Sequence, residues 1–187
     1  MPAPIRVNLS PKHLQLAEAE AERRQGVNSK LGLRGRNGGA ANGSKALDMH
    51  RLGAMGEVAV AVHLGLEAHL FAEQTAKRGS PDLPGDIEVK TRSRHSYDLI
   101  VQKDERPDKK LVLATIQNGI VFIHGWCVAG DVMQERFWSD PAGNRPAYFV
   151  PKNNLRSIHE LQELLKSGES TVVTPPTCPS TSFPSLS

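Results

Sequence analysis

The stretch from Ser80 to Arg94 reads SPDLPGDIEVKTRSR, and it decides the fold of the surrounding chain. Pro84-Gly85 favours a turn, because proline pre-sets φ at the second turn position and glycine accepts positive φ at the third. After the turn, apolar and β-branched residues alternate with charged ones, which is typical of a strand with two different faces. One face is expected to carry Ile87, Val89 and Thr91, and the other Asp86, Glu88 and Lys90.

The charged face of this strand allows two interpretations. An edge strand of an antiparallel sheet often turns one polar face to water, and the pattern alone fits that explanation. Its setting favours a functional one, because Asp82 precedes the turn and Glu57 lies upstream in a strongly apolar segment. Divalent magnesium or manganese prefers carboxylate oxygens as ligands. A lysine beside them can orient a water molecule or offset charge that develops on phosphorus.

Pro81-Asp82, followed after five residues by Glu88-Val89-Lys90, resembles the active-site signature of the PD-(D/E)xK nuclease superfamily, including its phage and bacterial members. The likeness covers about residues 48–130. It implies a restriction-endonuclease-like α/β fold with a mixed, mostly antiparallel central sheet flanked by helices. It also implies that Asp82 and Glu88 bind Mg²⁺ or Mn²⁺, that Lys90 positions the attacking water, and that Glu57 is a further catalytic metal ligand.

The turn leaves two aspartates as candidates for the first metal ligand. In an ideal two-residue hairpin closed by Pro84-Gly85, Leu83 would pair with Asp86, and Asp82 would lie on the face opposite Glu88. Either the first strand is short and irregular, so that Asp82 reaches around its end, or Asp86 is the ligand. The family pattern favours Asp82 and simple pleat geometry favours Asp86. We expect Asp82.

Glu57 belongs to a helix predicted from Asp48 to about Leu66. The apolar stripe of this segment follows helical spacing, and the opposite side carries further small apolar residues around Glu57. A helix that is apolar nearly all round is buried, and an ionised glutamate within it needs a metal or a basic partner. The alternative is a glutamate that reaches solvent at the wet end of the helix.

The chain upstream combines a helix with a basic loop. Ser10-Pro11 is typical of a helix start, and a helix with a thin apolar stripe is predicted from Lys12 to about Gln25. A loop rich in Gly and Asn should follow from Gly26 to Ser44. Between Arg23 and Arg51 there are seven Lys or Arg residues and one acid. The loop is therefore either a solvated segment or a basic arm that contacts phosphates.

Two basic segments supply the candidates for nucleic-acid binding. One is the upstream loop, and the other follows Lys90, where basic and hydroxyl residues continue to His95. A solvated strand end also explains the second segment. Aromatic residues are not interleaved in the upstream loop, so base stacking is not implied there. The candidate contacts are Arg34, Arg36, Arg92 and Arg94.

Downstream, the pattern predicts a meander of about five strands with a helix to cover it. Asn118-Gly119 is the strongest short hairpin signal in the chain. The predicted strands are Tyr97–Gln102, Leu111–Gln117, Ile120–Cys127 and a final short one at Ala147–Val150. A short helix is predicted over Val132–Trp138 and a terminal helix over Asn154–Lys166.

Composition sets limits on the class of protein. The chain has 187 residues, a net charge of +3 and two cysteines, which are too few for a disulfide framework or a zinc site. No apolar run approaches the length of a membrane helix. We expect a cytoplasmic protein of a bacterial or phage-infected cell. The expected division is an N-terminal helix and basic loop (1–47), a nuclease-like core (48–167) and a disordered Ser/Thr/Pro-rich tail (168–187).

The sequence therefore predicts a magnesium-dependent nuclease that acts on nucleic acid, with DNA favoured by analogy with the superfamily. Two other classes compete with it. One is a catalytically inactive nucleic-acid-binding or virion-associated protein that retains the nuclease fold. The other is a structural protein whose charged strand faces water. The oligomeric state is left open.

Overall fold

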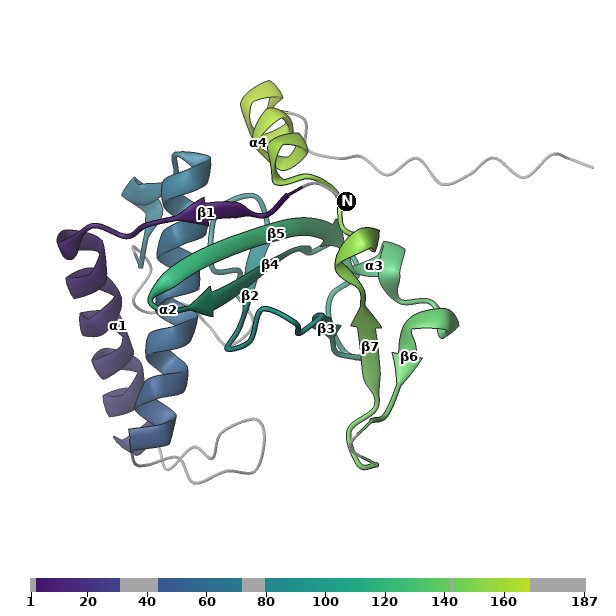
Figure 1. Ribbon diagram of the computed structural model, residues 1–187, viewed down its shortest axis with the longest axis horizontal. Helices are drawn as coiled ribbons and strands as arrows, with labels where there is room; N and C mark the ends of the chain where they lie inside the picture. Colours follow the sequence, from purple (N-terminus) through teal and green to yellow (C-terminus); the bar gives the residue numbers. More distant parts are fainter. Residues whose placement is uncertain (1–2, 31–43, 72–79, 142, 169–187) are drawn as a thin grey trace, which may run out of the picture.

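The computed structural model describes residues 3–30, 44–71, 80–141 and 143–168. A four-stranded mixed sheet forms the centre, with helices against one face and a smaller three-stranded sheet beside the other (Figure 1). The helices are α1 (Pro11–Lys30), α2 (Ser44–Leu64), α3 (Ala129–Val132) and α4 (Ile158–Ser167). The strands are β1 (Ile5–Val7), β2 (Ile87–Arg92), β3 (Leu99–Val101), β4 (Lys110–Gln117), β5 (Ile120–Val128), β6 (Trp138–Ser139) and β7 (Ala147–Val150). Short 3-10 turns cover Glu67–His69, Glu135–Phe137 and Lys152–Asn154.

The central sheet has the order β1-β5-β4-β2, and only the β2–β4 pair is parallel. The predicted mixed, mostly antiparallel sheet flanked by helices is thus confirmed. The β4–β5 hairpin turns at Asn118-Gly119, whose φ angles of 52° and 75° are the positive values that a tight hairpin turn requires.

The five-strand meander is wrong in one respect. β3 leaves the central sheet and pairs with β7, which also pairs with β6, so these strands form a second, antiparallel sheet. The physical reason is burial: Leu99 and Val101 pack against Leu111 and Leu113 on the back of β4. The chain leaves the central sheet after β2, forms β3 in the second sheet, and then returns as β4. Because of this excursion, β4 can lie parallel to β2 rather than antiparallel.

The N-terminal segment contributes to the core. Residues 5–7 pair with β5, and Val7 belongs to the main apolar cluster. α1 continues to Lys30 and does not end near Gln25, and α2 begins at Ser44. Ala17 of α1 packs with Ala54 and Val58 of α2. The rest of the predicted basic loop (31–43) and nearly all of the predicted tail (169–187) lie outside the described residues.

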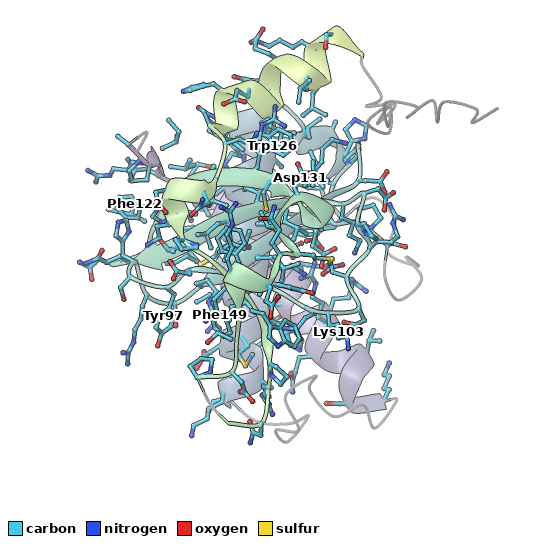
Figure 2. The ribbon with its side chains drawn as sticks, turned by 90° about the vertical axis from the view of Figure 1, so that its right-hand side faces the viewer. Tyr97, Lys103, Phe122, Trp126, Asp131 and Phe149 are labelled. Carbon is cyan, nitrogen blue, oxygen red and sulfur yellow. The ribbon has the colours of Figure 1, made fainter. Side chains whose placement is uncertain are left out.

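The downstream elements follow the predictions with shifted bounds. β7 matches the predicted final strand, whereas the short helix near residue 132 ends earlier and is followed by a 3-10 turn. α4 starts at Ile158, where Ser157 and Glu160 form a reciprocal cap. Trp126 is fully buried beneath α4 and donates its indole N–H to the Ser157 carbonyl at 3.1 Å (Figure 2). Among the described residues, no helix is long and apolar enough to cross a bilayer.

α2 crosses the edge of the sheet at very short range. Gly56 lies directly over Thr91 of β2, and a Cβ added at Gly56 would lie 1.9 Å from the Thr91 hydroxyl oxygen. Only glycine permits this approach. The contact fixes α2, and with it the neighbouring Glu57, against the strand that carries Glu88 and Lys90.

We predict that Gly56→Ala lowers the free energy of unfolding by about 1–3 kcal/mol, because the new methyl group must displace Thr91 or the helix. The matched control is Gly26→Ala in α1, where an added Cβ meets no atom within 4 Å. That change should raise stability by up to about 1 kcal/mol, because alanine favours the helix. Urea unfolding measures both. Equal stability of the two variants would contradict the close crossing.

Candidate functional site

The hairpin before β2 has a three-residue loop. Leu83 and Ile87 form an antiparallel bridge, with N–H to O=C distances of 3.0 and 3.3 Å. Gly85 and Asp86 both adopt positive φ, at 79° and 58°. The ideal two-residue hairpin, in which Leu83 would pair with Asp86, is therefore not formed, and the pairing is shifted by one residue. Because aspartate tolerates the left-handed conformation better than most side chains, Asp86 serves as the third loop residue.

This register decides which aspartate lies beside Glu88. With Leu83 opposite Ile87, Asp82 lies across from Glu88 and on the same face. Asp82 Oδ2 accepts a hydrogen bond from the Val89 backbone N–H at 2.7 Å. Asp86 instead accepts from Arg106 at 2.6 Å, in a half-exposed ion pair. The first strand is short, and this register lets Asp82 lie beside Glu88; whether Asp82 binds a metal stays a prediction.

Glu88 and Lys90 belong to a cluster of alternating charges. Lys90 Nζ lies 3.0 Å from a carboxylate oxygen of both Glu88 and Glu105. Lys109 Nζ lies 3.0 Å from the other Glu88 oxygen and 3.1 Å from Glu105. Glu88 and Lys90 side chains are each 19% exposed, and Lys109 is 4% exposed. The face is thus not the fully solvated one of a simple edge strand.

Glu105 and Lys109 are members of the site that the sequence pattern did not indicate. Burial raises the pKa of Glu105, but Lys90 and Lys109 outweigh it, so its pKa lies below the ordinary value. Both residues come from the charged segment before β4, and the parallel β2–β4 pairing places them beside Glu88. A pair of opposite charges four residues apart was the available signal, but that pattern is common on exposed turns.

Glu57 is buried at 4% exposure and is held by Arg24 of α1. The two Arg24 terminal nitrogens donate to the two Glu57 oxygens at 2.7 and 2.6 Å, and Arg24 Nε donates to Glu20 at 2.7 Å. Burial raises the pKa of Glu57, Arg24 opposes that effect, and the charges of Glu20 and Glu88 add to it, so that the net direction is upward. The prediction that this glutamate needs a basic or metal partner is met here by arginine.

The three predicted carboxylates influence one another. The pKa of Asp82 lies well above its ordinary value, first because of burial and then because of the negative charges of Glu57 and Glu88. Among the described residues, the hydrogen bond from Val89 is the only one that the Asp82 carboxylate accepts. Asp82 is thus the carboxylate of the three with no protein cation bound to it in the described chain.

The donor set fits a hard divalent cation in chemical kind, since it consists of carboxylates. Its present geometry is not a formed metal site, because no three Asp, Glu, His or Cys side chains in residues 3–30, 44–71, 80–141 and 143–168 are grouped to hold an ion. Arg24 neutralises Glu57, and two lysines neutralise Glu88. A metal ion would have to compete with these cations.

The predicted nucleic-acid contacts are only partly placed. Arg34 and Arg36 lie outside the described residues. Arg92 and Arg94 both approach the Tyr97 ring, at 5.0 and 5.6 Å from its centroid. Burial lowers the pKa of Arg92, whose Nε has no hydrogen-bond partner among the described atoms.

Part of the predicted basic arm is used for internal pairing. Arg23 binds Glu20 through two hydrogen bonds of 2.7 Å. Arg51 pairs with Glu18 at 2.5 and 2.6 Å and so joins α2 to α1. Arg24 also joins the two helices, through Glu57. These three arginines are therefore committed to pairs within the protein, and they do not form a free phosphate-binding arm.

Comparison with known proteins found no matching family model, no similar curated protein and no similar solved structure. A function therefore has to be inferred from the positions of these side chains. The arrangement most informative about function is that of Asp82 across from Glu88, with Lys90 beside Glu88.

We predict that Asp82→Asn removes a pH-dependent loss of stability in EDTA. The pKa of Asp82 is raised by folding, so its contribution is fully present below the ordinary value of about 3.9 and is lost as pH rises through the folded value. Asparagine stays neutral and can still accept from Val89. The variant should be more stable than the parent at pH 7 and similar near pH 4, by urea unfolding.

Asp86→Asn is the matched control, since it changes the same residue type in the same loop but removes only an exposed pair with Arg106. It should follow the parent across the pH range within about 1 kcal/mol. If Asp82→Asn tracked the parent equally well, burial and the neighbouring carboxylates would not be raising the pKa of Asp82.

We predict that Arg24→Gln destabilises the protein by about 1–3 kcal/mol, because it leaves the buried Glu57 carboxylate without its cation. Glu57→Gln in the same chain should recover part of the loss, because two neutral amides can share a hydrogen bond. A double-mutant cycle by urea unfolding measures the coupling energy. Additive effects of the two changes would show that the pair does not stabilise the fold.

Proposed function

We propose that this protein is a metal-dependent nuclease that hydrolyses phosphodiester bonds, with DNA as substrate. The observation that carries the proposal is the hairpin register, which places Asp82 across from Glu88 with Lys90 Nζ 3.0 Å from the Glu88 carboxylate. Two carboxylates can hold a divalent cation that lowers the pKa of a bound water, and a lysine beside them can orient that water. The choice of DNA as the substrate rests on the resemblance to the PD-(D/E)xK superfamily and is an analogy.

Asp82, Glu88 and Glu57 are the groups that would hold Mg²⁺ or Mn²⁺. When bound, the metal supplies Lewis acidity, which lowers the pKa of a water molecule and polarises the scissile phosphate. Burial raises the pKa of Asp82 first, and repulsion from the charges of Glu57 and Glu88 raises it further, so the ionised carboxylate favours a bound cation. A metal would relieve that repulsion.

The surrounding charges have defined roles in this proposal. Lys90 Nζ is held between Glu88 and Glu105, which fixes its position for a hydrogen bond to the attacking water. Lys109 holds the second Glu88 oxygen and so fixes the orientation of that carboxylate. Glu105 and Lys109 are therefore positioning residues. Arg24 is hydrogen-bonded to both Glu57 oxygens. At least one of these bonds has to break before Glu57 can act as a metal ligand.

A second candidate function has its own supporting observation. Arg24 donates hydrogen bonds to both carboxylate oxygens of Glu57. Among the described residues, no group of metal-ligating side chains is arranged to hold an ion. These features favour a nucleic-acid-binding protein that retains the fold without catalysis. The two candidates differ in whether Mg²⁺ binds with a defined stoichiometry and whether DNA is cut.

We predict that the protein nicks or degrades DNA with Mg²⁺ or Mn²⁺ and that EDTA stops the reaction. Supercoiled plasmid, linear duplex and single strand should be incubated in parallel, and the products followed on gels. Glu88→Ala, Lys90→Ala and Asp82→Asn should each lower the rate at least about a hundredfold, because each removes a metal ligand or the water-orienting group.

Asp86→Asn is again the matched control and should retain at least half of the parent rate. Isothermal titration with Mn²⁺ separates the two candidate functions, since the catalytic one requires saturable binding that Glu88→Ala weakens. If Glu88→Ala and Lys90→Ala both cut as fast as the parent, the nuclease proposal is wrong.

A further inference from the structure

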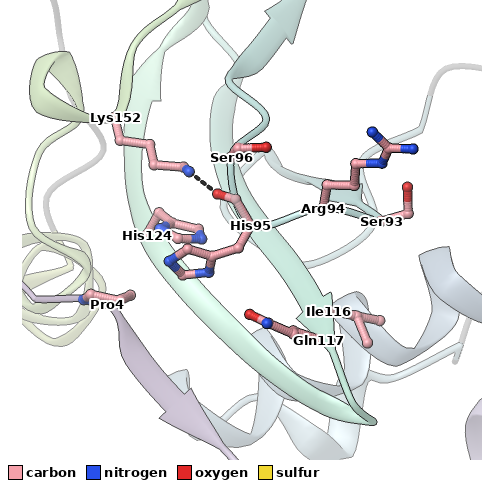
Figure 3. Close-up of a pocket in the computed structure, with 9 residues that line it drawn as sticks. All are labelled: Pro4, Ser93, Arg94, His95, Ser96, Ile116, Gln117, His124 and Lys152. Carbon is pink, nitrogen blue, oxygen red and sulfur yellow. Dashed lines mark hydrogen bonds between the residues drawn. The ribbon is translucent and has the colours of Figure 1, made fainter.

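A cavity lies just beyond the end of β2. Its volume is about 690 Å³, within the range of small-molecule sites. Ser93, Arg94, His95 and Ser96 line it from the segment after β2, and His124 and Lys152 line it from the other side (Figure 3). None of these residues belongs to the carboxylate cluster described above.

The charged side chains that line this cavity are both basic. Arg94 and Lys152 supply two cations, and no Asp or Glu is among the described residues that line it. Lys152 Nζ donates a hydrogen bond to the His95 carbonyl, which holds the lysine at the cavity wall (Figure 3). Burial lowers the pKa of His124 to about 4, and the neighbouring Lys152 and His95 contribute to this effect. The site therefore favours an anion.

The histidine wall of the cavity is fixed by packing. His124 is 7% exposed, and its Nε2 lies 2.8 Å from the Thr115 hydroxyl. The His95 ring lies 4.7 Å from the His124 ring and 5.3 Å from Phe122, between ring centroids. Ring positions held in this way do not have to be ordered when a ligand binds, which lowers the cost of binding.

The cavity is close to the candidate active site along the chain. Lys90 and Arg94 are four positions apart in the sequence, and four steps span at most about 13 Å at about 3.3 Å per residue in an extended strand. That distance corresponds to a few nucleotides of a nucleic-acid strand. Two serine hydroxyls and two cations give the cavity more donors than a single phosphate needs, and Ile116 and Pro4 add an apolar part of the wall.

We propose that this cavity binds a phosphate-bearing nucleotide unit of the nucleic-acid strand that enters the candidate active site. Arg94 and Lys152 contact the phosphate, the serine hydroxyls share its remaining oxygens, and the apolar wall contacts the attached sugar or base. The inference that the phosphate belongs to a nucleic-acid strand rests on the proposed function. A free nucleotide offers the same chemistry and is the alternative source.

The test is binding of a fluorescently labelled single-stranded oligonucleotide, by anisotropy, in EDTA so that no cleavage occurs. Arg94→Gln/Lys152→Gln should bind at least about tenfold more weakly than the parent. The slope of log affinity against log salt should become shallower by about 0.7 for each phosphate that the variant no longer neutralises. Arg94→Lys/Lys152→Arg, which keeps both charges, should retain affinity within about threefold.

Lys166→Gln is the matched control, because Lys166 is an exposed lysine in the last turn of α4 and does not line the cavity. It should bind as the parent does, and thermal unfolding should show that all variants are folded. Equal binding by the parent and the double Gln variant would overturn the proposal. An equal loss in the charge-retaining variant would also overturn it.

Competition with a mononucleotide and with inorganic phosphate separates the two sources. A strand site is expected to resist millimolar concentrations of both. If a mononucleotide binds the parent but not the double Gln variant, while strand binding is the same in both, the strand as source is wrong. Because the assay needs no metal or catalysis, its outcome is independent of Glu88→Ala and Lys90→Ala cleavage results.

Discussion

The bridge between Leu83 and Ile87 is the constraint on which the candidate site depends. It makes the turn three residues long, and a loop one residue shorter would move Asp82 to the opposite face from Glu88. The extra residue is Asp86, which adopts positive φ and is held by Arg106. A conformational preference of one exposed aspartate thus determines which side chains meet in the half-buried interior of the site.

Charge compensation is the second organising principle. Glu57, Glu88 and Glu105 are at least partly buried, and each is paired with an arginine or lysine within 3.1 Å. Buried carboxylates without such partners would have to be protonated or bind a metal. Asp82 is the exception in the described chain, and burial, followed by the charges of Glu57 and Glu88, raises its pKa. Arginine or lysine side chains pair with two of the three candidate ligands, Glu57 and Glu88. The third, Asp82, has no such partner among the described residues.

Local signals predicted the local structure well. The alternation from Ile87 to Lys90, the Asn118-Gly119 turn and the β7 strand follow from residue pattern alone, and the α/β class with its mixed sheet was also predicted. What could not be predicted depends on partners distant in sequence. β1 is too short to show a pattern, and β3 changes sheets because its buried face contacts β4.

The same limit applies to the site. Glu57 was predicted to need a compensating charge, but the identity of that charge, Arg24, depends on how α1 packs on α2. Glu105 and Lys109 lie beside Glu88 because β4 returns parallel to β2, and only the tertiary fold specifies that return.

The parallel pairing of β2 with β4 has a consequence for the order of folding. During synthesis the Asp82–Lys90 hairpin leaves the ribosome before Lys109, and the excursion through β3 must close before that lysine can reach Glu88. Pairing of this kind is slow because loop entropy has to be overcome first. Until β4 pairs with β2, Glu88 has Lys90 beside it but lacks Lys109, so the charge balance of the site is completed only by the tertiary fold.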